Sequence, residues 1–378
     1  MDHSVNIIDA DTHQMEPPNF WEERIDPAYR SGAPRMVERQ EGRTYEVEGE
    51  PLTRSSDKSY PMTAKYSAAS AEAAARFARA KATGYSPASR LEDMDAYGVG
   101  VQVLYPTVTG QLLGREFHDS DLLVACCRTY NDWSADYCAT APARLRWAAV
   151  VPLQDVSSAL EEVRRTGAMG AGAFFVRPQP VKGRNLSHRD YVPLWKEIER
   201  LDKPLCIHDS ASCQLPSFGD RMQTHTAGHI ISHPFEAMAA MTDLIWNGVF
   251  EQFPRLTVVH VEADSGWLPY WLQRMEQHWR QLGNAEHPEM LRAPTEYFKS
   301  NVFVSCRGDE PTLKSVVELV GDDELLINTD YPHVDGTWPW GFDELKRQPI
   351  PESGIEKILW RNAARAFRID RNGESGGP

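Results

Sequence analysis

Histidine and carboxylate side chains gather at the ends of four segments that have the composition of buried strands. The first segment reads Asp9-Ala10-Asp11-Thr12-His13, and alternate residues of a strand share one face. Three later segments, residues 206–209, 259–262 and 328–333, carry the same residue types. Imidazole and carboxylate groups are the usual protein ligands of zinc, iron and manganese, so these segments predict a metal site. The candidate ligands are Asp11, His13, Glu16, His208, His260, Glu262 and Asp330.

The mixture of ligand types indicates which metal would suit such a site. Converging carboxylates repel one another unless a cation neutralises them. Imidazole-rich tetrahedral sites suit Zn²⁺, whereas mixed histidine and carboxylate sites accept Fe or Mn at higher coordination. Three histidines and four carboxylates exceed what one metal usually takes, and they approach the set that holds two irons in helical di-iron carboxylate proteins. The inventory favours two iron ions with Glu262 or Glu16 as the bridge.

Five further residues are candidates for binding substrate or for orienting a ligand. His229 and His233 have the i,i+4 spacing of helical metal ligands, but the glutamate of an HExxH motif is missing, and substrate contact is the other interpretation. Arg177 lies at the end of the predicted fourth strand and is placed to hold a carboxylate or phosphate; a solvated arginine is an equal alternative, and Arg307 has the same two interpretations. His333 follows the eighth strand and is placed to orient a metal ligand.

These residues need a scaffold that brings four strand ends to one rim. Short β-branched runs alternate with longer amphipathic stretches, which is typical of βαβ units and a parallel sheet. Eight strand–helix pairs in order favour an α/β fold of the (β/α)8 TIM-barrel type over an open sheet, and no Gly-rich nucleotide loop follows any strand. The predicted strands are Val5–Asp9, Val101–Tyr105, Trp147–Val151, Ala171–Val176, Pro204–His208, Leu256–Glu262, Asn301–Ser305 and Leu325–Asn328.

Two segments are longer than a bare barrel needs. Residues 22–87 follow strand 1 and residues 210–233 follow the fifth strand, at the face where barrel active sites lie. We expect one metal-dependent barrel domain over residues 1–370, with the long insertion 22–87 as a cap or lid, or alternatively a dimerisation arm. A helix is expected to begin at Pro234, with proline in its first turn. Residues 371–378 are expected to be a flexible tail.

Charge limits the classes of partner. The chain of 378 residues has 54 acidic and 40 basic residues and a net charge of −14, which argues against nucleic acid and anionic membranes as partners. No apolar run approaches the ~18 residues of a membrane span, and the start, Met1-Asp2-His3-Ser4, lacks the features of a signal peptide. We therefore expect a cytoplasmic protein with a small-molecule substrate, and a homodimer is the default assembly.

The chain resembles the amidohydrolase-related branch of the amidohydrolase superfamily, which includes aminocarboxymuconate-semialdehyde decarboxylase and related aryl-acid decarboxylases. The resemblance spans nearly the whole chain, with residues 22–87 as the main extra segment. Any single motif is loose, but their order makes the assignment specific. The matching stretches are IDADTH (8–13), CIHD (206–209), FPRL (253–256), TDYPH (329–333) and KILWRNAAR (357–365).

The resemblance also implies roles for particular residues. It places the family's metal positions at Asp11, His13, His208 and Asp330. Hydrolytic and decarboxylating relatives end the sixth strand with an acid–base histidine, where this chain has Glu262. Many dinuclear hydrolases carry a bridging lysine on the fourth strand, and residues 172–178 contain none. The superfamily also holds a non-haem di-iron monooxygenase group acting on bulky terpenoid coenzyme A thioesters, and this chain is similar to that group.

Three functions follow, from different classes. The first is a non-haem di-iron monooxygenase that uses two Fe ions and O2 to hydroxylate a bulky apolar substrate, favoured by the carboxylate-rich ligand set. The second is a hydrolase or non-oxidative decarboxylase with one Zn or Mn ion, in which Asp330, His260 or Glu262 moves the proton. The third is a binding or scaffold barrel without metal, against which the full set of acidic and histidine residues argues. Our interpretation prefers the oxygenase on the number of ligands.

Overall fold

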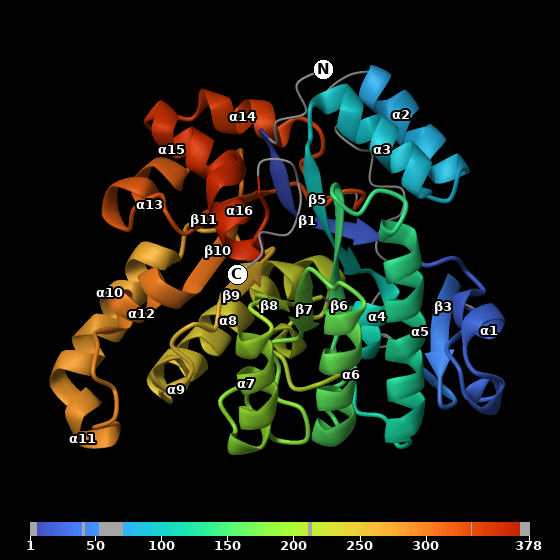
Figure 1. Ribbon diagram of the computed structural model, residues 1–378, viewed down its shortest axis with the longest axis horizontal. Coiled ribbons are helices and arrows are strands. Elements are labelled where there is room, and N and C mark those ends of the chain that lie inside the picture. The colour runs from blue at the N-terminus through green and yellow to red at the C-terminus, as the bar shows by residue number, and fades with distance from the viewer. Residues whose placement is uncertain (1–5, 40–41, 53–70, 211–213, 334, 371–378) are drawn as a thin grey trace.

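Eight parallel strands form the centre of the molecule (Figure 1), a computed structural model that describes residues 6–370 except 40–41, 53–70, 211–213 and 334. Neighbouring strands pair in the order β1-β5-β6-β7-β8-β9-β10-β11. The two ends of this sheet meet where the amide of His13 donates to the Tyr331 carbonyl at 2.6 Å and the amide of Asp330 donates to the Asp11 carbonyl at 3.0 Å. The predicted (β/α)8 barrel is therefore confirmed.

The strands lie close to their predicted places, and the first one runs further than expected. The prediction ended it at Asp9, whereas the observed strand continues to Gln14 with all seven residues buried. Its polar residues continue the strand because their side chains are buried at the barrel mouth. The strands are β1 (Ile8–Gln14), β5 (Val101–Pro106), β6 (Leu145–Val150), β7 (Ala173–Val176), β8 (Leu205–His208), β9 (Val258–Val261), β10 (Val302–Arg307) and β11 (Leu325–Asn328).

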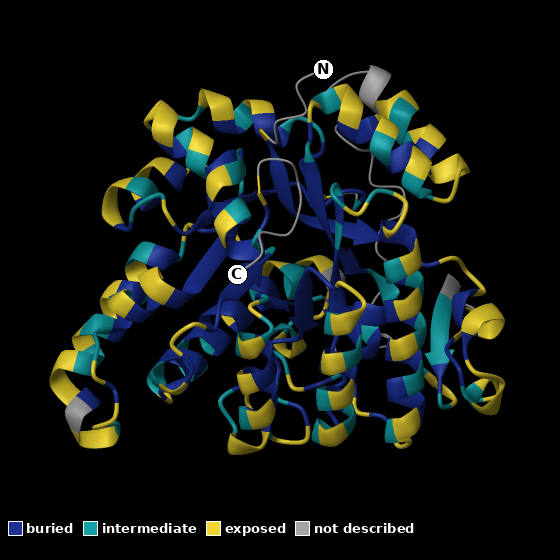
Figure 2. Cartoon of the chain, viewed as in Figure 1, coloured by how far each residue is buried: buried dark blue, intermediate teal, exposed yellow. Residues whose placement is uncertain are grey.

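Helices surround the strands, with apolar faces inward and exposed residues outward (Figure 2). On α7 (Val192–Arg200), for example, Leu194, Trp195 and Ile198 are fully buried, which is the spacing of an amphipathic helix. No helix in the described part of the chain combines the length and apolar character that a membrane span requires. The barrel helices are α3 (Pro87–Tyr97), α4 (Val108–Leu112), α5 (Ser120–Cys138), α6 (Val156–Ala168), α7 (Val192–Arg200), α8 (His225–Trp246), α9 (Val249–Gln252), α10 (Leu268–His278), α12 (Pro294–Asn301), α13 (Leu313–Leu319), α14 (Gly341–Arg347), α15 (Glu352–Glu356) and α16 (Asn362–Phe367).

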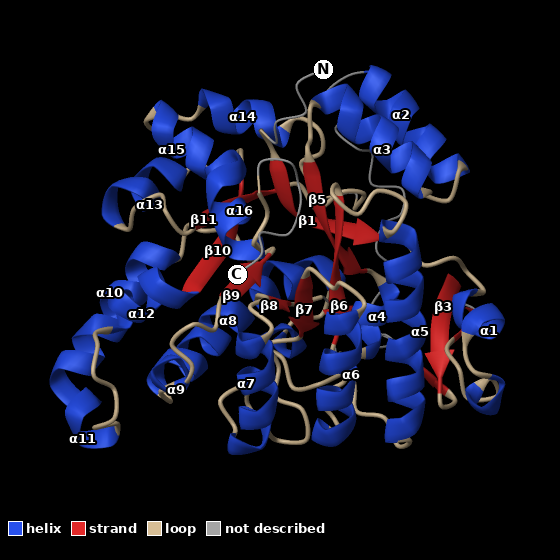
Figure 3. Ribbon diagram, viewed as in Figure 1, coloured by secondary structure: helices blue, strands red, loops and turns tan. Residues whose placement is uncertain are grey.

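The described part of the 22–87 insertion separates into two pieces. A small antiparallel sheet of β2 (Arg35–Arg39), β3 (Gly42–Val47) and β4 (Glu50–Pro51) lies with α1 (Phe20–Arg24) beside α5 (Figure 3). Helix α2 (Ala71–Ala82) packs instead against α3. Gln214 ties the small sheet to the segment after β8, because its side-chain amide donates to the Pro51 carbonyl at 2.6 Å. The role of this insertion as a lid stays a prediction, as do the domain limits; the tail 371–378 lies outside the described residues.

Helix α8 begins earlier than the sequence predicted. The expected start was Pro234, but the helix starts at His225, and Pro234 lies inside it. Thr224 sets this start, since its side chain accepts a hydrogen bond from the amide of Ala227 at 3.3 Å, as an N-cap does. Proline removes one helical hydrogen bond without preventing the turn before it. The correction matters because it makes His229 and His233 neighbours on a helix.

Candidate metal centre

Strand β1 delivers two of the candidate ligands, Asp11 and His13, to the barrel mouth. Both side chains are buried. Asp9, two residues earlier, has another role: its carboxylate accepts hydrogen bonds from the amide and the hydroxyl of Thr329, at 3.0 and 2.5 Å. Burial raises the pKa of Asp9 to about 8, against the lowering effect of these hydrogen bonds. Asp9 therefore ties β1 to the end of β11, and the two residues beyond it face the mouth.

The tautomers of two histidines are set by backbone carbonyl groups. Nδ1 of His13 lies 2.9 Å from the Pro106 carbonyl oxygen, and Nδ1 of His208 contacts the Asp209 carbonyl oxygen. A carbonyl can only accept, so each Nδ1 carries the hydrogen and each neutral ring has a lone pair on Nε2. The two Nε2 atoms face one another at 3.2 Å.

Carboxylate oxygens complete this group. Asp11 Oδ1 lies 3.4 Å from His13 Nε2 and 3.6 Å from His208 Nε2. Asp330 Oδ1 lies 3.2 Å from His13 Nε2, and the buried Asp11 Oδ1 has no hydrogen-bond partner among the described residues. On the other side, Glu262 Oε2 lies 3.2 Å from His208 Nε2. We call Asp11, His13, His208 and Asp330 the primary subsite, with Glu262 at its edge.

The primary subsite fits a metal ion. Neutral rings would leave two imidazole lone pairs and the carboxylate oxygens facing one another without a donor, an arrangement that needs a cation. Ligand atoms bound at about 2.0–2.2 Å from one metal lie about 3–3.5 Å apart, and the contacts between His13 Nε2 and its partners span 3.2–3.4 Å. The atoms of Asp11, His13, His208 and Glu262 all lie within 4.8 Å of one another. The donor set suits Zn²⁺ or Mn²⁺.

The pKa values of the primary subsite show which of its side chains hold protons when no metal ion is bound. Burial acts to raise the pKa of Asp11, but the charges of His208 and His13 lower it to about 2. Burial acts to lower the pKa of His208, but Asp11 raises it to about 9. Burial, and then the charge of Glu262, raises the pKa of Asp330 well above its usual value. A bound metal would displace such protons, because metal and protons compete for the same lone pairs.

Two of the carboxylates stand on unusual backbone. Glu262 and Asp330 follow β9 and β11 with φ of 52° and 56°, in the left-handed region that residues other than glycine seldom adopt. The amide of Glu262 donates to the Ser305 hydroxyl at 2.9 Å, which holds the turn. Such backbone strain concentrates where a side chain must be aimed. Here it turns Glu262 toward His208 and Asp330 toward His13.

A second group of ligand-type side chains adjoins Glu262. Glu262 Oε1 lies 3.6 Å from His229 Nε2, and Oε2 lies 3.7 Å from His233 Nε2. His229 Nε2 also lies 3.5 Å from Asp335 Oδ2. The three residues His229, His233 and Glu262 have ligand atoms within 4.8 Å of one another.

Two other predicted residues reach different surroundings. His333 stacks on His13 with ring centroids 4.1 Å apart and places Nδ1 2.7 Å from Asp330 Oδ1, so it is positioned to orient both. His260 is fully buried, neither ring nitrogen has a partner among the described residues, and burial lowers its pKa to about 3. It joins none of the groups of ligand atoms found in the described residues.

Glu16, Arg177 and Arg307 are engaged in contacts within the protein. The Glu16 carboxylate accepts from the amides of Val108 and Thr109 at 3.0 and 2.8 Å and from the Thr109 hydroxyl at 2.8 Å. The geometry thus gives this carboxylate to the start of α4 instead of to the metal groups. Arg307 pairs with Asp309 at 3.1 Å, half-exposed at the rim.

Arg177 lies in the interior and supports a ligand from behind. Its guanidinium donates to Asp209 Oδ1 at 2.6 Å, and both side chains are buried. Gln179 donates to the same oxygen, also at 2.6 Å. Asp209 follows His208 directly and supplies the carbonyl that holds the His208 ring. Sequence reasoning missed Asp209, although its position next to a candidate ligand was a usable signal.

Arg90 is a second residue that the sequence did not reveal. Its guanidinium is buried, contacts the carbonyl oxygen of His13, and donates to the Gln102 side chain at 2.9 Å. It also lies 4.9 Å from the ring centroid of Tyr331. Arg90, on α3, therefore braces the ends of β1 and β11. An arginine on an otherwise ordinary helix gives no sequence signal for this role.

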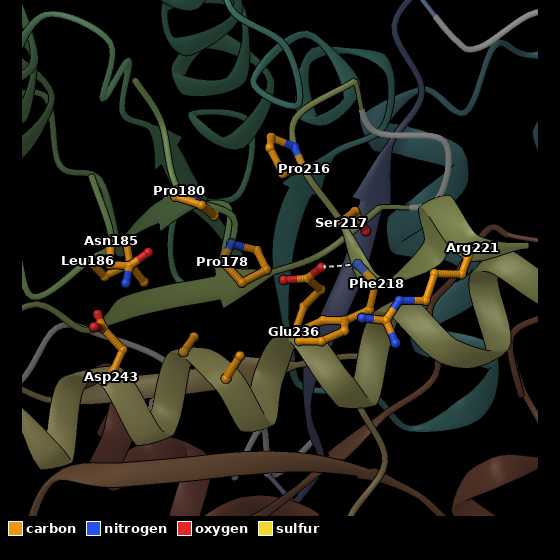
Figure 4. Close-up of a pocket in the computed structure, with 12 residues that line it drawn as sticks. Pro178, Pro180, Asn185, Leu186, Pro216, Ser217, Phe218, Arg221, Glu236 and Asp243 are labelled. Carbon is orange, nitrogen blue, oxygen red and sulfur yellow. Dashed lines mark hydrogen bonds between the residues drawn. The ribbon is translucent and has the colours of Figure 1, made fainter. Parts of the chain in front are cut away.

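A cavity of about 350 Å³ lies along α8, and Pro178, Phe218 and Glu236 are among its lining residues. Figure 4 shows Glu236 on α8 reaching the backbone of Phe218, whose amide donates to it at 2.8 Å. None of the residues of the primary subsite or of the group around Glu262 lines this cavity. It neighbours the metal centre without containing it.

Comparison with known proteins gives one consistent result at the level of sequence. The family model described as amidohydrolase matches residues 8–369. A gamma-resorcylate decarboxylase of Rhizobium sp. (strain MTP-10005) is 28% identical over 299 residues, covering 75% of this chain and 87% of the relative. A 2-amino-3-carboxymuconate-6-semialdehyde decarboxylase of Dictyostelium discoideum is 25% identical over 294 residues, covering 76% of this chain and 78% of the relative.

Solved structures share the fold. An amidohydrolase from Mycobacterium avium subsp. paratuberculosis K-10 superposes with a TM-score of 0.77 at 21% identity, covering 96% of this chain and 99% of that one. A dihydroxybenzoic acid decarboxylase from Polaromonas sp. JS666, solved with bound manganese and the inhibitor 2-nitroresorcinol, superposes with a TM-score of 0.65 at 19% identity, covering 96% and 97%. These likenesses support the barrel architecture.

Proposed function

Because the chain belongs to the amidohydrolase family, we propose that it is a metal-dependent, non-oxidative decarboxylase of an aromatic carboxylic acid. The observation that carries the proposal is the primary subsite, where His13 and His208 direct their Nε2 atoms at one another across 3.2 Å. Two of the relatives that match along most of their length are decarboxylases. The two relatives named here favour this reading over the oxygenase that ligand number had favoured.

The proposed roles divide between holding the metal and moving a proton. Asp11, His13 and His208 would hold the ion, which when bound supplies a Lewis acid for the substrate carboxylate. Asp330, whose Oδ1 lies 3.2 Å from His13 Nε2, would hold a proton and give it to the ring carbon that loses CO2. The C–C bond breaks, its electron pair stays on that carbon, and the proton from Asp330 completes the new C–H bond. His333, 2.7 Å from Asp330, orients the acid.

The test is an assay of the metal-loaded protein against a panel of hydroxybenzoates that includes 2,6-dihydroxybenzoate. We expect release of CO2 without consumption of O2, loss of activity after chelation, and recovery with Mn²⁺ or Zn²⁺. In D2O the product should carry one deuteron at the position of the lost carboxyl group. Absence of CO2 release from every aromatic acid in the panel, with metal bound, would contradict the proposal.

Di-iron oxygenation is the second candidate function. One observation favours it: His229 and His233 add imidazole ligands beside Glu262, so the mouth holds more ligands than one ion takes. The expected signs are two irons per chain after purification without chelator, and O2 consumption with a bulky acyl thioester. The same assays therefore separate the two candidates, since only one of them consumes O2.

A further inference from the structure

The cavity of about 350 Å³ lies between α8 and the loops that follow β7 and β8 (Figure 4). Its volume is typical of sites that bind small molecules. One face of α8 forms its floor, where the small side chains of Ala239 and Ala240 leave space over the helix. Pro178 and Pro180, after β7, and Pro216, after β8, line the opposite side. The middle of the cavity is therefore walled by apolar groups.

Two carboxylates from α8 line the same cavity. Glu236 and Asp243 are seven residues apart, which places them on one face of the helix and about 10 Å apart along its axis. Figure 4 shows Glu236 beside Phe218 and Asp243 toward Asn185, in opposite directions from the middle. Glu236 is buried and Asp243 is half-buried. The cavity thus has two acidic groups separated by an apolar floor.

Neutral groups donate the hydrogen bonds that hold these two carboxylates. Glu236 Oε1 accepts from the amide of Phe218 at 2.8 Å. Asp243 accepts from the amide and hydroxyl of Ser187 at 2.8 and 2.7 Å and from the Asn247 side chain at 3.0 Å. Neither carboxylate has an ion-pair partner in the described part of the chain. Burial is the first cause that raises the pKa of each, and a cation beside them would stabilise both charges.

The charge of the lining residues selects the kind of ligand. Two carboxylates would repel an acid, including the aromatic acid of the proposed function. One metal ion cannot reach both groups, because they lie two helical turns apart, and neither joins the groups of ligand atoms found in the described residues. Among the described lining residues only Arg221 is basic, and its exposed guanidinium lies over the Phe218 ring, 5.9 Å from the centroid. An organic cation with two charged ends and an apolar middle matches this lining.

We propose that the cavity binds a short aliphatic diamine, with one ammonium group at Glu236 and the other at Asp243. Each ammonium group donates to a carboxylate oxygen at about 2.8 Å. The methylene chain between them covers Ala239 and Ala240 and packs against Pro178. This site is separate from the metal centre, and the proposal does not depend on decarboxylation.

Calorimetry on the full, metal-loaded chain tests the proposal with a matched pair of ligands. 1,5-Diaminopentane and n-hexylamine have the same number of non-hydrogen atoms and differ in the charge of one end. We expect 1,5-diaminopentane to bind about tenfold more tightly at neutral pH, because its second ammonium group makes a further charged hydrogen bond. Hexanoate, which has a similar length and the opposite charge, should not bind.

Substitutions in the cavity locate the binding site. Glu236→Gln keeps an acceptor for the Phe218 amide and removes the charge, so the affinity for 1,5-diaminopentane should fall about tenfold. Ala239→Leu fills the floor of the cavity and should weaken the binding of both amines. Glu352→Gln, at an exposed position, is the matched control and should bind 1,5-diaminopentane as the wild type does.

Three results would overturn the proposal. The first is equal affinity of the wild type for the two amines, and the second is an unchanged affinity for 1,5-diaminopentane in Glu236→Gln. The third is the absence of binding of either amine, which would leave water as the content of the cavity. If Glu236→Gln without ligand melts below the wild type, Ala239→Leu decides the question. None of these results changes the metal content or the release of CO2, so failure here is distinct from failure of the proposed function.

Discussion

At the scale of single residues, the candidate metal centre depends on which ring nitrogen of each histidine carries the hydrogen. Pro106 and Asp209 carbonyl groups take the Nδ1 hydrogens of His13 and His208, so both lone pairs point inward. The residues behind the ligands therefore decide what the ligands can bind, as outer partners commonly do in metal sites. Arg177 acts at one further remove, because it fixes Asp209 through a buried ion pair of 2.6 Å.

Replacing Asp330 with asparagine tests the proposed proton donor. Asparagine keeps the size of the side chain and tolerates the left-handed backbone at this position, where φ is 56°. It cannot exchange a proton, so we expect decarboxylation to slow by about 10²–10⁴-fold while the metal content of the primary subsite is retained. Asp309→Asn, at the rim beside Arg307, is the control. Loss of metal together with activity would instead make Asp330 a ligand only.

At the scale of elements, some carboxylates after the strands face the metal centre, whereas others accept hydrogen bonds from the start of a helix. Glu16 follows β1 as closely as the ligands do, yet it receives the free amides at the start of α4. The first amides of a helix have no partner within the helix, so a carboxylate there is stabilising. Proximity in sequence to a metal ligand thus does not decide which of the two roles a carboxylate takes.

Glu16→Gln should therefore change stability and leave the metal unchanged. The amide side chain keeps one acceptor oxygen in place of two, and loses the charge that the amides of α4 favour. We expect a loss of about 1–2 kcal/mol in the free energy of unfolding, measured by urea denaturation of metal-free protein. Metal per chain should equal that of the wild type. A lower metal content in Glu16→Gln, with stability unchanged, would restore Glu16 to the ligand set that the sequence predicted.

The sequence predicted what depends on periodicity and missed what depends on loop geometry. All eight strands lie near their predicted ranges because burial imposes its pattern on the residues themselves. Asp11, His13 and His208 could be grouped because parallel strands end at one rim. The start of α8 could not be predicted, because Pro234 resembled a first-turn proline, whereas the N-cap is Thr224. The contacts of Glu16 and Arg177 arise between segments far apart in sequence, which periodicity does not relate.

At the scale of the whole molecule, the chain is acidic, with a net charge of −14, and some of its carboxyl groups are buried with raised pKa values. Asp9, Glu310 and Glu324 are three of them. Burial is the first cause for each: the pKa of Asp9 rises to about 8, and those of Glu310 and Glu324 to about 7. Each group binds its proton more tightly in the folded chain than in the unfolded chain. Their stabilising effect is present in acid and is lost as pH rises.

Glu324→Gln isolates this effect away from the metal centre. Glu324 precedes β11, and burial followed by the charge of Asp323 raises its pKa from 4.5 to about 7. The wild type should therefore lose stability between pH 4.5 and about 7, as the folded chain is forced to release that proton. Glutamine has no proton to release, so the urea midpoint of Glu324→Gln should gain on the wild type as pH rises from 5 to about 8. Glu352→Gln, at an exposed position, is the control, and its urea midpoint should follow that of the wild type. If the midpoints of Glu324→Gln and the wild type differ by the same amount at every pH, Glu324 is already ionised in the folded protein.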